Sequence, residues 1–265
     1  MIKCLSIAGF DGSGGAGIQA DLKTFMAFGC YGMTVLTALP IQNTCGVKNC
    51  YDIPIQSIEE QLQAIFEDIV PDAIKIGMLF SAPIISLVAR FLEENALDIP
   101  IILDPVMVAK SGHPLLQPDA VDILKQQLIP LTTIITPNLP EAYVLAHQTE
   151  DMNELAHQLL VLGSKAVLLK GGHSNAKTSD DLYVDQQGNQ HVLEAPRIQS
   201  NNTHGTGCTL SAAICAGIAH GLSPLEACQQ AKIYLTNAIQ AAQNDSVGKG
   251  NGPLNHFCST HLLRS

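Results

Sequence analysis

The chain has 265 residues and a formal net charge of −10, and 46% of its residues are hydrophobic. No basic tract is present, so the composition argues against a nucleic-acid partner. The apolar stretch after Met1 is too short for a signal peptide, and no apolar run approaches the roughly 18 residues of a membrane-spanning helix. A cytoplasmic protein without a membrane partner is therefore expected, with its eight cysteines, none of them in a Cys-x-x-Cys pair, kept reduced.

Short apolar runs alternate with longer amphipathic stretches along the first two thirds of the chain. The apolar runs predict strands at Ile2–Ala8, Gly29–Leu39, Ala73–Ile76, Ile99–Leu103, Thr133–Thr136 and Ala166–Leu169. The stretches between them have helical periodicity, at Gly17–Phe28, Ile58–Ile69, Ala82–Asn95, Pro118–Leu128, Pro140–His147 and Met152–Leu162. This alternation predicts βαβ crossovers, and hence an α/β fold with a mostly parallel central sheet flanked by helices on both faces.

The last third of the chain has a different pattern. Asp181–Ala195 alternates polar and apolar residues around a turn at Gly188, which predicts a small antiparallel hairpin at the edge of the sheet. Gly207–His220 and Leu225–Ala242 are predicted helices, and the first is apolar enough to be buried. Because no linker, repeat or low-complexity segment interrupts residues 1–265, a single domain is expected.

Polar or glycine-rich segments follow five of the predicted strands. In a parallel sheet, ligands bind beyond the carboxyl ends of the strands, so these segments are expected to border one site. They are Gly9–Gly17, Gly77–Met78, Asp104–Val106, Thr136–Glu141 and Lys170–Gly172.

A glycine-rich turn, Thr203–Cys208, precedes the apolar helix. Its glycines allow successive backbone N–H groups to point into one concavity at the helix N-terminus, which suits the oxygens of a transferring phosphoryl group. The same pattern also suits a helix that packs tightly on a sheet. We expect the helix dipole to lower the thiol pKa of Cys208, which is a candidate base, binding group or packing residue. His204 is a candidate phosphate contact.

Two carboxylates and a lysine stand directly after strands. Asp104 and Glu141 are the carboxylates best placed for Mg²⁺, although they also suit a turn cap and a helix start. Lys170 either meets nucleotide phosphates or leaves the sheet for solvent. The glycines of 12–17 do not form a Walker A loop, because no Gly-Lys-Ser/Thr follows, and we expect Asp21, one helical turn beyond Gly17, to face the same cavity.

Ordered motifs across the chain resemble one family. Residues 8–24 are similar to the opening of the hydroxymethylpyrimidine/phosphomethylpyrimidine kinases of the ribokinase-like superfamily, and the similarity continues to about Phe257. The later motifs are Gln42–Thr44, Lys75–Met78, Asp104–Val106, Thr136–Glu141, Leu169–His173 and Thr203–Thr209. The resemblance implies a ribokinase-like fold and two ATP-dependent phosphorylations, first of 4-amino-5-hydroxymethyl-2-methylpyrimidine and then of its monophosphate.

The resemblance also implies roles for single residues. Cys208 matches the catalytic-base position, and Gly205, Thr206 and Gly207 match the anion hole. The pyrimidine pocket corresponds to Gly9, Asp21, Gln42, Met78 and Val106, and Lys110 is expected to reach the monophosphate in the second step. Nucleotide-side positions are Asn138, Lys170 and Lys232, and Asp104 and Glu141 match the magnesium region.

Three further expectations accompany the resemblance. A pyridoxal kinase of the same superfamily is the nearest alternative, and a non-catalytic pyrimidine sensor is disfavoured because the anion turn, Cys208 and both carboxylates are present. Family precedent predicts a homodimer, with Val47–Ile53 as an edge strand that pairs or covers the pocket. The tail departs from the glycine–histidine alternation of the family at Lys249, Asn251 and Asn255.

Overall fold

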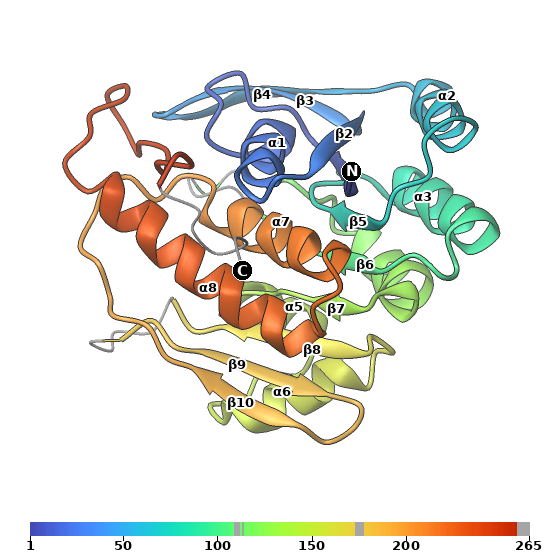
Figure 1. Cartoon of the computed structure of the whole chain (residues 1–265). Helices are drawn as coiled ribbons and strands as arrows, with labels where there is room; N and C mark the ends of the chain where they lie inside the picture. The colour runs from blue at the N-terminus through green and yellow to red at the C-terminus, as the bar shows by residue number, and fades with distance from the viewer. Residues whose placement is uncertain (109–111, 113, 173–177, 259–265) are drawn as a thin grey trace.

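The computed structural model describes residues 1–108, 112, 114–172 and 178–258, and its centre is an eight-stranded sheet in the order β10-β9-β8-β7-β6-β5-β1-β2 (Figure 1). Neighbouring strands from β2 to β8 are parallel, whereas β9 and β10 form the predicted antiparallel hairpin at one edge. The strands are β1 (Lys3–Ala8), β2 (Tyr31–Leu36), β5 (Ala73–Ile76), β6 (Ile101–Leu103), β7 (Ile134–Ile135), β8 (Ala166–Lys170), β9 (Asp181–Asp185) and β10 (Gln190–Leu193).

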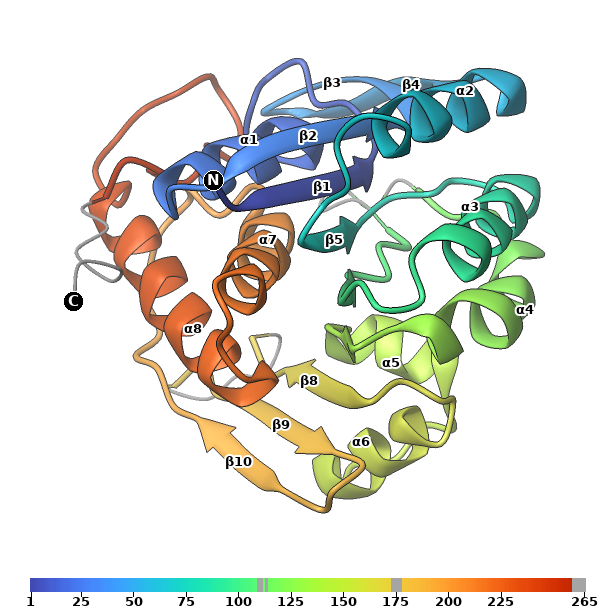
Figure 2. The ribbon, with the colours of Figure 1, turned by 45° about the vertical axis from the view of Figure 1, so that its right-hand side comes forward.

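Helices cover both faces of this sheet, as the alternation of side chains along each strand requires. On β1, Leu5 and Ile7 pack in the core beneath α2 to α6, whereas Cys4 points to the opposite core beneath α1, α7 and α8 (Figure 2). The first group is α2 (Ile55–Phe66), α3 (Ala82–Asn95), α4 (Ala120–Ile123), α5 (Leu139–Leu145) and α6 (Met152–Leu160). The second is α1 (Gly17–Ala27), α7 (Thr206–Ala219) and α8 (Pro224–Ala241). No helix among the described residues is long and apolar enough to span a membrane.

The predicted strand Gly29–Leu39 is in fact divided between two sheets. At Thr37 the chain leaves the main sheet, and the Thr37 hydroxyl donates to the carbonyl of Met78. The chain then forms β3 (Ala38–Asn43), which pairs with β4 (Gly46–Asp52) in a separate two-stranded sheet. The strand predicted at Val47–Ile53 is thus present as β4, and its Cys50 packs with Ala38 and Met78.

The predicted helix Pro118–Leu128 is less regular than its pattern suggests. After α4 the chain continues as a π-helical segment (Leu124–Leu128) and a 3₁₀ turn (Ile129–Leu131). Pro130 stands in this turn, and its lack of an N–H group prevents an α-helix from continuing through it.

Candidate active site

The N-terminus of α7 lies against the ends of two central strands. Its N-cap, Gly205, has φ +84°, and a Cβ there would collide with the carbonyl oxygen of Gly15. A Cβ on Gly207 would lie 3.1 Å from Oδ2 of Asp104 and 3.5 Å from Nζ of Lys170. The glycine-rich turn and the residues after β6 and β8, predicted separately from the sequence, therefore converge.

Lys170 links the two carboxylates that follow the strands. Its Nζ lies 2.8 Å from Oδ1 of Asp104 and 4.0 Å from Oε2 of Glu141. Burial alone would lower the pKa of Lys170, but the charges of Asp104 and Glu141 outweigh it and raise the pKa. Lys170 does not leave the sheet for solvent, because only 14% of its side chain is exposed.

Glu141 has a structural role as well as a place in this cluster. It is the third residue of α5 and forms a capping box with Asn138, in which each side chain accepts a hydrogen bond from the other residue's backbone N–H, at 2.8 and 2.9 Å. Burial raises the pKa of Glu141 to about 7, against the opposing charge of Lys170. The side-chain oxygen of Asn138 accepts a hydrogen bond in the cap. Its role in nucleotide binding stays a prediction.

Asp104 and Glu141 fit the needs of a magnesium ion. Mg²⁺ takes hard oxygen ligands and is bound in kinases through one or two carboxylates together with substrate phosphates. Among the described residues, no group of three or more His, Cys, Asp or Glu side chains is arranged to hold a metal alone. Two carboxylates beside the glycine-rich turn therefore fit an ion that arrives with a nucleotide.

Cys208 lies in the first turn of α7 and is half-buried, but its ionisation differs from the prediction. We expected the helix dipole to lower the thiol pKa; instead, burial raises the pKa of Cys208 to about 11, and the positive charge of Lys75 offsets only part of this. Asp21 and Asp104 add to the rise because nearby negative charges disfavour a thiolate.

Asp21 does not face an open cavity, contrary to expectation. Its fully buried carboxylate accepts hydrogen bonds from Lys75 Nζ at 2.8 Å and from the hydroxyl of Ser6 at 2.6 Å. Burial would lower the pKa of Lys75, but Asp21 outweighs this effect and raises it. The sequence reasoning missed this role of Lys75, although a lysine within the apolar strand Ala73–Ile76 must be paired if it is buried.

Four predicted pyrimidine-pocket residues gather between the main sheet and the β3–β4 hairpin. Met78 packs with Ala38 and lies beside Gly9, where a Cβ would be 3.0 Å from the Met78 sulfur. Val106 packs on the same cluster, and the side-chain amide of Gln42 donates to the carbonyl of Phe10 at 3.3 Å. Lys110 lies outside the described residues.

Lys232 and Asp181 support the end of β8. Asp181 is the second residue, after Lys75, whose role the sequence analysis missed. Lys232 Nζ lies 2.6 Å from Oδ2 of Asp181, and Oδ1 of Asp181 accepts the N–H of Gly171 at 3.0 Å. The ammonium of Lys232 is therefore paired with Asp181, which also binds the backbone of Gly171, next to Lys170. Its predicted contact with nucleotide stays a prediction.

His204, in the glycine-rich turn, has a partner in the N-terminal loop. Its Nε2 lies 2.8 Å from Oδ2 of the buried Asp11, which the sequence analysis had given no role. The predicted contact of His204 with phosphate stays a prediction.

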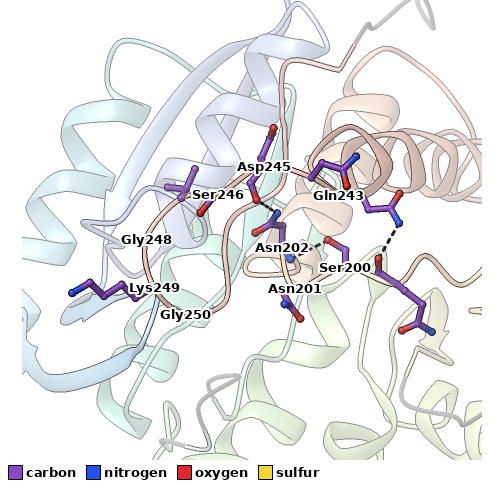
Figure 3. Close-up of a pocket in the computed structure, with 12 residues that line it drawn as sticks. Ser200, Asn201, Asn202, Gln243, Asp245, Ser246, Gly248, Lys249 and Gly250 are labelled. Atoms are coloured by element: carbon purple, nitrogen blue, oxygen red, sulfur yellow. Dashed lines mark hydrogen bonds between the residues drawn. The ribbon is translucent and has the colours of Figure 1, made fainter.

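A polar cavity of about 510 Å³ lies beside these elements but contains none of the predicted site residues. It is lined by the segments 199–202 and 243–250, where Asn202 donates to the carbonyl of Asp245 at 2.8 Å (Figure 3).

The comparison with known families shows to which family the chain belongs. A family model described as phosphomethylpyrimidine kinase matches residues 11–255. The chain belongs to the phosphomethylpyrimidine kinase family. A hydroxymethylpyrimidine/phosphomethylpyrimidine kinase of Salmonella typhimurium is 46% identical over 261 residues, 97% of each chain.

Solved structures of phosphomethylpyrimidine kinase relatives share the fold. A Clostridium difficile phosphomethylpyrimidine kinase is 44% identical, with a TM-score of 0.78 over 90% of this chain and 100% of that one. An ADP complex of a Bacillus subtilis pyridoxal kinase is 38% identical, with a TM-score of 0.87 over 97% of this chain and 98% of that one. The ribokinase-like fold implied by the motifs is confirmed.

Proposed function

We propose that this chain phosphorylates 4-amino-5-hydroxymethyl-2-methylpyrimidine with ATP, and then phosphorylates the resulting monophosphate to the diphosphate, for thiamine biosynthesis. The observation that carries the proposal is that the glycine-rich turn, Asp104 and Lys170 meet at the ends of the parallel strands. The glycine turn before α7 lies against Asp104 and Lys170, with Cys208 in the next positions of the same helix. The pocket residues Gly9 and Met78 pack together below the β3–β4 hairpin.

The arrangement suggests how the chain promotes phosphoryl transfer. The hydroxymethyl oxygen attacks the terminal phosphorus of ATP, the bond from that phosphorus to the bridging oxygen breaks, and ADP leaves. The N–H groups of residues 205–207 stabilise the charge on the transferring group, because they are aligned at the positive end of α7. Cys208, in its thiolate form, receives the proton of the hydroxyl.

The two carboxylates and Lys170 serve the nucleotide. Asp104 and Glu141 would hold Mg²⁺, which neutralises charge on the phosphate oxygens when it is bound. Lys170 lies between both carboxylates and within reach of the turn, so it orients the polyphosphate and keeps the carboxylates from repelling it. Asn138 and Lys232 complete the nucleotide side.

A coupled assay of ADP release tests the proposal. The purified protein is given ATP, Mg²⁺ and one of three acceptors: the pyrimidine, its monophosphate or pyridoxal. We expect turnover with both pyrimidine species. The absence of turnover with either would refute the main proposal, and turnover with the unphosphorylated pyrimidine alone would remove the second activity.

Pyridoxal phosphorylation is a second candidate function. It is supported by the similarity to the Bacillus subtilis pyridoxal kinase, which extends over 97% of this chain. Turnover with pyridoxal in the same assay would establish this function. If none of the three acceptors is phosphorylated, the result would favour a pyrimidine sensor.

We also propose a homodimer that forms through the outer face of the β3–β4 hairpin. Ala38 and Cys50 point inward to the pocket cluster, whereas Ile41 and Tyr51 are exposed on the other face of the same sheet. Light scattering tests this, since Tyr51→Asp is expected to shift the molar mass toward that of a monomer. We place the enzyme in the cytoplasm, where all eight cysteines, which are free thiols in the structure, remain reduced.

A further inference from the structure

Asp11 is a buried carboxylate with five hydrogen-bond donors around it. Oδ1 accepts from the N–H and the hydroxyl of Ser13, at 2.9 and 2.7 Å. Oδ2 accepts from the N–H groups of Gly15 and Ala16, at 3.0 and 2.7 Å, and lies 2.8 Å from Nε2 of His204. Burial alone would raise the pKa of Asp11, but the hydrogen bonds from His204 and Ser13 lower it to about 2. Asp11 is therefore charged at neutral pH and joins segments 193 residues apart.

His204 connects this loop to the phosphate-binding turn. It is the residue before the N-cap Gly205, whose left-handed backbone is pressed against the carbonyl of Gly15. The backbone N–H of His204 also donates to the carbonyl of Gly252 in the tail, at 3.0 Å. One residue thus receives a side-chain contact from the N-terminal loop and a backbone contact from the C-terminal tail.

The tail also contacts residues on either side of this turn and the tip of the β3–β4 hairpin. Asn251 donates to the carbonyl of Thr44 at the tip of the β3–β4 hairpin, and Gly252 packs closely on Asn202. Nε2 of His256 then lies 3.0 Å from the hydroxyl of Thr209, in α7. The turn is therefore held from two sides, by the loop around Asp11 and by the tail around His256.

This support matters because the turn itself is intrinsically soft. Two of the three residues at 205–207 are glycines, which have many accessible backbone conformations. Phosphoryl transfer depends on positioning and electrostatic stabilisation, so N–H groups that drift from the transferring group lose their effect. A turn built from glycine needs an outside group to fix its orientation.

We propose that Asp11 is a positioning residue, which acts through His204 to hold residues 205–207 in the orientation that receives the transferring phosphoryl group. Neither side chain contacts substrate in this role. The inference rests on the proposed kinase function, but its effect on the turn can be measured without any substrate.

The test uses His204, which lies before α7 and outside the core helices, so that its substitution does not remove a core side chain. Only 17% of its side chain is exposed. His204→Ala removes the contact with Asp11, whereas His204→Gln keeps an N–H donor at nearly the same distance from the backbone. His220→Ala is the matched control: His220 lies at the other end of α7, where its Nε2 contacts the carbonyl of Phe28 at 2.9 Å.

We expect kcat of His204→Ala to fall roughly 10-fold to 100-fold, as misplacement of a reacting group by about 1 Å does. Binding of the pyrimidine, measured by calorimetry without nucleotide, is expected to be unchanged. His204→Gln should recover most of the lost kcat, and His220→Ala should keep the kcat of the wild type. Amide hydrogen exchange at 205–209 should be faster in His204→Ala than in either the wild type or the control.

Two results would overturn the inference: an unchanged kcat in His204→Ala, or a joint loss of kcat and pyrimidine binding there with no recovery in His204→Gln, which indicates general misfolding. If the wild type lacks pyrimidine turnover, the proposed function fails instead. Hydrogen exchange then still decides whether the Asp11–His204 contact orders the turn.

Discussion

Nζ of Lys170 lies 2.8 Å from Oδ1 of Asp104, at the point where two strands of the parallel sheet end. The contact places a positive charge beside a carboxylate that would otherwise repel a polyphosphate. The lysine therefore neutralises Asp104, and we expect it to interact also with the phosphates when a nucleotide binds.

Lys170→Met should mainly impair the use of ATP. The variant leaves Asp104 and the nearby Glu141 without their cation, so we expect KM for ATP to rise roughly 10-fold or more, as loss of a charge-assisted contact of about 1.5–3 kcal/mol implies. Steady-state kinetics at varied ATP measures this. Lys165→Met is the control, because Lys165 is exposed and stands directly before the same strand. Equal KM values for the two variants would contradict the role of Lys170.

Glu141 gives the stability of the protein a pH dependence of known sign. Its pKa in the folded chain is about 7, above the ordinary value of 4.5, so the protonated form favours the folded state. The stabilisation is present in full below about pH 4.5 and is lost as the pH rises through about 7. Relative to Glu141→Gln, the wild type should lose up to about 3 kcal/mol of unfolding free energy from pH 5 to 8.

Glu226 provides the control for this measurement. It forms the same kind of capping box, with Ser223 at the start of α8, but its hydrogen bonds with Ser223 lower its pKa. Its contribution is therefore lost as the pH falls. Urea unfolding at several pH values gives the difference in unfolding free energy between the wild type and each variant. Plotted against pH, this difference should have a slope of opposite sign for Glu226→Gln and for Glu141→Gln. Slopes of the same sign would refute the assignment.

Cys208→Ala tests the proton-accepting role of the thiol. We expect kcat to fall by roughly 10²–10⁴-fold, the usual contribution of a general base, with pyrimidine affinity nearly intact. Because the pKa of Cys208 is about 11, kcat of the wild type should also rise with pH between 6 and 9, whereas that of the variant should not. Cys215→Ala, in the buried part of the same helix, should retain the wild-type profile. A variant with undiminished kcat would show that Cys208 only packs.

Gly205→Ala tests the shape of the anion turn. Gly205 and Gly221 both have positive φ, +84° and +91°, so alanine strains the backbone at either position. Only at Gly205 would the new Cβ also collide with another segment, at Gly15; nothing lies within 4 Å of a Cβ at Gly221. We expect a similar loss of stability of about 1 kcal/mol from strain alone, but a large loss of kcat only in Gly205→Ala.

The buried pair of Lys75 and Asp21 should contribute strongly to the stability of the protein. Lys75→Met leaves Asp21 as an uncompensated buried charge, so we expect a loss of about 3–5 kcal/mol in unfolding free energy. The double variant Lys75→Met/Asp21→Asn should lose less than Lys75→Met alone. Urea unfolding of these two variants and of Asp21→Asn completes the cycle, and additive losses would show that the two groups do not interact.

The sequence predicted the sheet well because its strands are buried on both faces and appear as continuous apolar runs. It failed at Thr37, since nothing local distinguishes a strand that stays in one sheet from a strand that passes into another. It also failed in Leu124–Leu128, where a π-helical segment replaces the expected α-helix.

The candidate site was predictable where residues stand directly after strands, because topology alone brings Asp104 and Lys170 to one edge. The contacts of His204 and Asp181 were not predictable, since each partner lies far away in the sequence. The ionisation of Cys208 was mispredicted for a similar reason. The helix dipole can be inferred locally, whereas burial beneath neighbouring segments cannot.

The contacts of the glycine-rich turn and of Thr209 with the tail have a consequence for how the protein is made. A chain leaves the ribosome from its N-terminus, so residues 250–256 emerge after the sheet and the helices. Until they do, His204 lacks its backbone partner Gly252, and Thr209 lacks His256. The sheet and most helices can assemble during synthesis, but a nascent chain or one truncated before Gly252 has an incompletely supported turn. A message cut short before the codon for Gly252 should therefore yield a folded protein with little kinase activity.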